Sequence, residues 1–193
     1  MDLGDLPADA SWRHVGVRTG YEVLFVDRVG DGVRLRGSTA AREGDASWYV
    51  GFEVEVDARW QTRRVRAVNA TAAGNGEVVL ERDPRGRWTV DGVPRPELDG
   101  CADVDFESSA VTNTLPVHRL PFTVGETVAA SAAFVRADDL SVERLEQRYT
   151  LLKMDDDGPV FHYESPTFDF ECELRFDPSG LVRTYPGIAV RDY

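Results

Sequence analysis

The sequence has no long apolar run and no apolar leader. Its best apolar run, Val128–Val135, consists mostly of small side chains. A helix that spans a bilayer needs about 20 apolar residues, so we expect no integral membrane association. The first residues, MDLGDLPADASW, have neither the basic start nor the apolar stretch of a secretory signal. We therefore expect a cytoplasmic protein.

Lysine is almost absent, and positive charge is in the minority. Lys153 is the single lysine among 22 basic residues, against 34 acidic residues, and the 193-residue chain has a formal net charge of −12. Such a surface repels the phosphates of nucleic acid, so nucleic acid is not an expected partner. The one basic run, Arg63–Arg66, is interpreted as a solvated strand face and not as a phosphate-binding patch. Salt screens the self-repulsion of an acidic, arginine-rich surface, and we expect a halophilic source.

Cysteine and histidine are too few for a disulfide framework or a zinc site built on several of them. Cys101 and Cys172 lack CxxC spacing, and there are three histidines. A bridge between the two cysteines stays open, although a reducing cytosol disfavours it. The sequence also lacks a GxSxG elbow and a GxxxxGK[ST] loop. We expect no metal, no cofactor and no catalytic residue.

Alternation of apolar and polar residues dominates what is there. In Ser47–Val56 and in Phe168–Phe176, every second residue is apolar, and shorter runs repeat the pattern along the chain. A period of two predicts half-buried strands, and Gly- and Pro-containing turns between them predict an antiparallel meander. A sheet of roughly a dozen or more strands should curl into a barrel or roll. We predict a mainly β, single domain over residues 1–193, with residues 1–10 as a candidate disordered tail.

Helical periodicity is confined to two segments. Ser109–Leu120 has Val111, Leu115 and Leu120 near helical spacing, and Pro116 fits only in a first turn, so this helix is expected to start near Thr114. Asp138–Tyr149 competes with it, but Gln147–Leu152 also has the pattern of a strand. We predict the helix in Ser109–Leu120.

Two polar clusters are candidates for ligand contacts. One is Thr112–Leu120, which contains Asn113, His118 and Arg119, and the other is Gln147–Thr150. Amide and guanidinium groups beside apolar residues suit a ligand with hydroxyls and a polar or anionic head. The alternative is structural, since polar groups packed inside a roll must satisfy one another.

A third cluster alternates along one expected strand. Cys101, Asp103 and Asp105 would share one face, and His118 or His162 could complete a metal site from elsewhere. We interpret these carboxylates instead as a polar strand edge that follows the Asp99–Gly100 turn.

Several segments together resemble a family of prokaryotic proteins named for glycolipid binding. The similarity runs in order from about Ser11 to Arg191, and its motifs are Trp12–Gly16, Tyr49–Asp57, Trp60–Arg63, Gly86–Trp88, Leu98–Asp105, Thr112–Pro116, Gln147–Thr150 and Tyr185–Gly187. The resemblance implies an antiparallel spiral β-roll wrapped around one α-helix and assembled as a homodimer. It also implies a fold similar to that of periplasmic lipoprotein carriers, and to an enzyme that reshapes a hydrophobic biosynthetic intermediate. Ser109–Ala110 and His118 depart from the family pattern.

The resemblance and the residues together predict a non-catalytic protein that binds a hydrophobic or amphipathic, glycolipid-like ligand. Its apolar part would lie on inward aromatic residues, for which the candidates are Trp48, Phe52, Phe168 and Phe170, although these also suit an ordinary core. Candidates for the polar head are Arg63, Asp103, Asn113, His118, Arg119, Gln147 and Arg148. Two alternatives remain: an enzyme acting on a lipid-like intermediate, with Asp99, Asp103, Asn113 or His118 transferring protons, and a structural homodimer without a small ligand. A pocket that contains a pH-tuned carboxylate would favour the enzyme.

Overall fold

The computed structural model describes residues 3–192, and most of them lie in one long antiparallel sheet. The neighbours along it come mostly from consecutive hairpins, and β17 pairs with β1 to join the two halves of the chain. In spatial order its strands are β10 (Thr127–Ala129), β13 (Arg148–Asp155), β14 (Gly158–Ser165), β15 (Phe170–Phe176), β16 (Val182–Tyr185), β17 (Ala189–Asp192), β1 (Asp9–His14), β2 (Thr19–Val29), β3 (Gly32–Glu43), β4 (Ala46–Val56), β5 (Thr62–Thr71), β6 (Gly74–Arg82), β7 (Trp88–Val90) and β8 (Val93–Pro94).

A second, small sheet contains β12 (Val142–Leu145), β11 (Ala132–Val135) and β9 (Asp103–Phe106). Its β9 and β11 run parallel, a pairing that the expected antiparallel meander did not include. Parallel neighbours need a long crossover, and here the crossover carries the helical segment of the chain. That segment contains η2 (Val111–Asn113) and α1 (Thr114–Arg119), while η1 (Pro96–Leu98) and η3 (Pro166–Phe168) are isolated turns.

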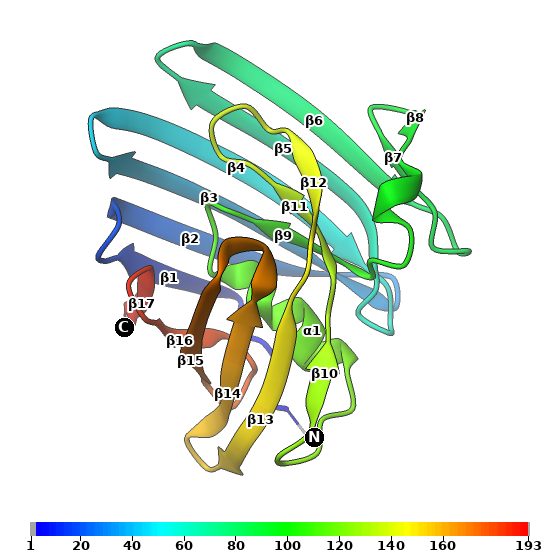
Figure 1. Cartoon of the computed structure of the whole chain (residues 1–193), viewed down its shortest axis with the longest axis vertical. Coiled ribbons are helices and arrows are strands. Elements are labelled where there is room, and N and C mark those ends of the chain that lie inside the picture. Colours follow the sequence, from blue (N-terminus) through cyan, green and yellow to red (C-terminus); the bar gives the residue numbers. More distant parts are fainter. Residues whose placement is uncertain (1–2, 193) are drawn as a thin grey trace.

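The long sheet curls around α1 and the small sheet, as Figure 1 shows. Contacts from distant strands meet at the helical segment and at the loop before it. The Thr39 hydroxyl of β3 donates to the carbonyl of Ser108, and the Tyr149 hydroxyl of β13 donates to Asn113. The side chains of Leu115 and Val117 are almost fully buried in the core. The prediction of a mainly β, single-domain antiparallel fold with one helix is confirmed.

The alternation in the sequence explains which faces are buried. In β4, Val50, Phe52, Val54 and Val56 face the core, as predicted. In the predicted strand Phe168–Phe176, only the second half follows the expectation. Leu174 and Phe176 are buried, Phe170 and Cys172 are half-buried, and Phe168 belongs to η3 and is 42% exposed.

The predicted helix is confirmed at Thr114–Arg119, where Pro116 lies in the first turn. The competing segment Asp138–Tyr149 contains β12 and the start of β13 instead. The side chain of Val142 faces the core from β12, because strand pairing with β11 decides its conformation.

The candidate tail over residues 1–10 is held by contacts wherever the structure describes it, and residues 1–2 lie outside the described part. Leu3 and Leu6 pack against the core, the amide of Gly4 donates to the Pro178 carbonyl (2.8 Å), and β1 begins at Asp9. Both cysteine thiols are free; Cys101 is buried and Cys172 is half-buried. Across residues 3–192, no helix has the length and apolar character needed to cross a membrane.

Candidate functional site: an aromatic cavity with a buried acidic floor

A cavity of about 350 Å³ lies between the small sheet and strands β14–β16. Strand alternation builds much of its wall, because Tyr163 and Ser165 of β14 and Phe170 of β15 point inward. Rings of Tyr163, Phe170 and Tyr185 lie 6.0–6.3 Å apart, in tilted or edge-to-face pairs. The aromatic residues that line the cavity are Phe106, Phe134, Tyr163, Phe168, Phe170 and Tyr185.

The floor of the cavity contains a buried carboxyl group. Asp105 of β9 is 8% exposed and accepts hydrogen bonds from the Thr112 hydroxyl, the Gln147 amide and the backbone amide of Phe106. Burial raises its pKa to about 6; the three donors lower the pKa and offset only part of this effect, while the charge of the nearby Asp103 raises it further. Asp105 can therefore exchange a proton near neutral pH.

Asn113 completes the polar floor. Its side-chain carbonyl accepts a hydrogen bond from the Tyr149 hydroxyl (2.8 Å), and its amide nitrogen lies 3.4 Å from the Ala110 carbonyl. Asn113 lines the cavity beside Asp105 and Ser109. A carboxyl group, an amide and a hydroxyl at one end of an aromatic cavity can both donate and accept hydrogen bonds.

Two arginine side chains, Arg18 and Arg136, also line the cavity. The Arg18 guanidinium donates to the Glu107 carbonyl (2.9 Å), and Arg136 pairs with the carboxylates of Glu107 and Glu143. The Arg136 guanidinium also lies 5.2 Å from the ring centroids of both Phe134 and Phe168. Phe168 is thus a partly exposed aromatic ring beside a cation.

Behind the cavity wall lies a second buried acid, which sequence reasoning missed. Glu22 of β2 is fully buried; it accepts hydrogen bonds from the Ser109 hydroxyl and from the amide of Ala110 (2.9 Å). Burial raises the pKa of Glu22 to about 7, against the opposing effect of these hydrogen bonds. It anchors the loop that carries Ser109 into the cavity wall.

The predicted polar strand edge is wrong, because Asp103 and Asp105 are both buried. The Asp103 side chain is 2% exposed and forms a bidentate ion pair with Arg119, at 2.9 and 2.6 Å. It lies outside the cavity lining. β9 is the edge strand of the small sheet, but Asp103 pairs with Arg119 and Asp105 accepts from Thr112, so both carboxylates have side-chain partners instead of solvent.

The structure separates most of the predicted head-group residues. Of that set, all within the described chain, Asn113 lines the cavity and Gln147 reaches it through Asp105. Arg63 pairs with Asp57, and Arg148 pairs with Glu164 at a partly exposed position.

His118 lies beside a different surface hollow, which includes Trp60 and Asp57. Its ring stacks on Trp60 with centroids 3.8 Å apart, and Nε2 lies 2.8 Å from the Ser179 carbonyl oxygen. Burial lowers the pKa of His118 to about 4. Its imidazole is therefore neutral near pH 7. His118 does not belong to the lining of the aromatic cavity.

Of the predicted apolar contacts, Phe168 and Phe170 line the cavity, whereas Trp48 and Phe52 do not. Phe52 stacks on Phe106 in the core at 4.8 Å, and Trp48 lies under the Arg18 guanidinium. Asp99, a proton-transfer candidate in the enzyme alternative, also lies outside the lining and accepts from the Trp88 amide.

Comparison with known proteins relates this architecture to others. The structure is similar to that of a DUF1089 family protein from Pseudomonas aeruginosa, with a TM-score of 0.75 and 28% identity over 97% of this chain and 95% of that chain. A β-barrel-like protein of the DUF1849 domain from Brucella abortus shares the fold alone, with a TM-score of 0.54 and 12% identity over 98% of this chain and 96% of that chain. No curated protein matches the sequence. A sequence profile described as "Putative glycolipid-binding" matches residues 9–191, so the chain belongs to that family.

Proposed function

We propose that the protein binds an amphipathic small molecule in the aromatic cavity, with hydroxyl groups of the ligand against Asp105 and Asn113. The observation that carries this proposal is the joint presence of six lining aromatic residues and a buried carboxyl–amide floor. Aromatic side chains supply apolar contact area, while the floor fixes orientation by hydrogen bonds. The family description supports a ligand with a sugar-like polar part.

The size of the cavity limits what can enter. Its volume of about 350 Å³ is near the lower end of small-molecule sites, which span roughly 300–1,000 Å³. A glycolipid with several long chains does not fit inside this volume. We therefore expect the cavity to take one polar ring or one chain, with the remainder leaving past Phe168 and Arg136.

The test uses octyl glucoside, a single-chain glycolipid mimic, below its micellar concentration. Titration of the full chain, followed by isothermal calorimetry, should show saturable one-to-one binding. Phe168→Ala should weaken it about tenfold, because it removes about 1–2 kcal/mol of apolar contact, and Asn113→Ala should weaken it through the lost polar contact. Leu152→Ala is the matched control, since Leu152 of β13 is 43% exposed, close to the 42% of Phe168, and lies outside the cavity lining.

Binding that is unchanged in both cavity variants, or weakened equally by Leu152→Ala, contradicts the proposal. Circular dichroism melts of each variant separate lost binding from lost folding. This matters for Asn113→Ala, which also removes the hydrogen-bond partner of Tyr149.

A catalytic role is the second candidate, and one observation favours it. Asp105 lines the cavity and has a pKa of about 6, so it can act as a proton donor or acceptor near neutral pH. Incubation of host lipid extracts with wild-type protein and with Asp105→Asn, followed by mass spectrometry, distinguishes the two functions. Turnover by the wild type alone supports catalysis, and a bound, unchanged lipid supports binding.

The homodimer stays a prediction, as do the halophilic source and the cytoplasmic location. The feature that supports a dimer is an apolar patch on the outer face of β2, formed by Tyr21, Val23 and Phe25 with Tyr49 of β4 nearby. Contiguous exposed apolar surface of this kind is typical of an interaction site. A structural role without any small ligand would leave the cavity without a function.

A further inference from the structure

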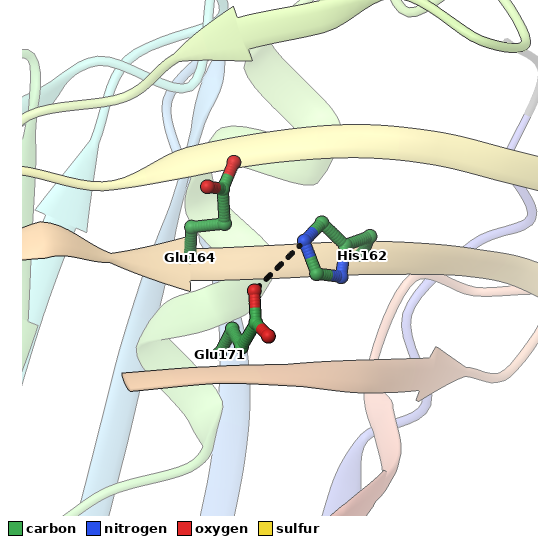
Figure 2. Close-up of side chains that lie close together, drawn as sticks. All are labelled: His162, Glu164 and Glu171. Atoms are coloured by element: carbon green, nitrogen blue, oxygen red, sulfur yellow. Dashed lines mark ion pairs between the residues drawn. The ribbon is translucent and has the colours of Figure 1, made fainter. Parts of the chain in front are cut away.

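A histidine and two glutamates converge on the outer face of β14 and β15, away from the cavity. Figure 2 shows His162, Glu164 and Glu171 projecting on the same side of these strands. One potential ligand atom from each lies within 4.8 Å of the others, and His162 Nε2 is 3.5 Å from Glu171 Oε2.

The register of the hairpin produces this convergence. His162 and Glu164 are two residues apart on β14 and so share a face, and Glu171 of β15 lies directly opposite Glu164. Two carboxylates directly opposite each other on neighbouring strands repel. Arg148 relieves part of this repulsion through a hydrogen bond of 3.0 Å to Oε1 of Glu164.

We propose that His162, Glu164 and Glu171 bind a divalent first-row transition metal ion, with zinc as the reference ion. One imidazole nitrogen and two carboxylate oxygens are ligands that zinc accepts, and water would fill the remaining position. At metal–ligand distances of about 2.1 Å, tetrahedral ligand atoms lie about 3.4 Å apart. His162 and Glu171 are already at 3.5 Å, so a rotation of the Glu164 side chain completes the site.

The chemistry discriminates among cations. Magnesium and calcium prefer oxygen ligands throughout, whereas the imidazole favours zinc, cobalt, nickel or copper. The side chains of His162 and Glu164 are 37% and 27% exposed, so an ion can reach them while the sheet restricts their motion.

The site also bears on the cavity. Tyr163 and Ser165 alternate with the proposed ligands on β14, and Phe170 precedes Glu171 on β15. An ion that bridges the outer faces of β14 and β15 would therefore restrain the inner faces that form the cavity wall.

The experiment uses the full-length chain without a histidine tag, treated with a chelator and dialysed. Zinc chloride is titrated by calorimetry, cobalt chloride is followed by visible absorption, and magnesium chloride serves as the ion control. We expect one zinc per chain, a rise in the melting temperature with zinc, and no such response to magnesium. His162→Gln and Glu171→Gln should each weaken zinc binding at least tenfold.

Glu81→Gln is the matched control, because Glu81 is also an exposed strand glutamate paired with an arginine, and it should bind zinc like the wild type. No saturable zinc binding by the wild type overturns the proposal. So does zinc binding that persists in both His162→Gln and Glu171→Gln. Glu171 is 73% exposed, so its variant tests the site even if His162→Gln fails to fold.

Discussion

Replacing Glu22 by glutamine should remove a large pH dependence of stability. Glu22 is fully buried, and burial raises its pKa from 4.5 to about 7. Between these pH values the folded protein binds more protons at Glu22 than the unfolded chain does. The free energy of unfolding of the wild type therefore falls as the pH rises through this window. The stabilisation by protonated Glu22 is fully present below pH 4.5 and lost above pH 7.

The magnitude follows from the two pKa values. One pKa unit is equivalent to about 1.4 kcal/mol, so the difference between 4.5 and about 7 corresponds to roughly 3 kcal/mol. Glutamine can reproduce the hydrogen bonds of the protonated acid. Its oxygen accepts from the amide of Ala110, and its nitrogen takes the place of Oε1 and donates to the Ser109 hydroxyl, which now donates to Glu22. Glu22→Gln should thus gain roughly 3 kcal/mol relative to the wild type between pH 4.5 and pH 8.

Urea unfolding measured at half-unit intervals from pH 4.5 to pH 8 supplies the data. Tryptophan fluorescence reports on the core, since Trp12 and Trp88 are almost fully buried. The other titrating groups occur in both proteins and cancel in the difference between them. Parallel pH profiles for wild type and Glu22→Gln would refute the reasoning, because they would mean that Glu22 titrates alike in the folded and unfolded chains.

Two further predictions concern the buried ion pair and the outer face of β2. Asp103→Asn should destabilise the protein by about 3–5 kcal/mol in urea unfolding, because it leaves the Arg119 guanidinium uncompensated; a loss below about 1 kcal/mol would mean that solvent already screens the pair. Phe25→Arg should convert a homodimer into a monomer in light scattering at high salt, since Phe25 is 50% exposed in the apolar patch. A wild-type monomer, or a dimer unaffected by the change, would remove that patch as the interface.

Strands and helix could be predicted from the sequence because both depend on local periodicity. β4 has valines and a phenylalanine at every second position, and strict alternation requires one buried face. Pro116 restricts the helix to a start near Thr114, where the structure has it. The parallel pairing of β9 with β11 has no such local signal, because it depends on how the crossover packs.

β2 shows where periodicity does not decide which face is buried. Glu22 and Leu24 are buried in the structure, and Tyr21 is 56% exposed. Both faces of this strand carry apolar residues, so a one-residue shift costs little apolar burial. The hydrogen bonds to Glu22 come from a loop almost ninety positions away, and no pattern within the strand reveals them.

The polar residues of Thr112–Leu120 lie close together in the sequence, but they do not form a single site in the structure. Helix geometry explains why they separate. Successive residues on a helix point about 100° apart, so neighbours in the sequence need not share a side. Asn113 faces the cavity, His118 stacks on Trp60, and Arg119 pairs with Asp103. The acid that lines the cavity with Asn113 is Asp105 of β9, and only the fold shows that the two residues meet. A local cluster in a roll therefore predicts where polar contacts concentrate, whereas the strands packed against it determine which of its residues can meet a ligand.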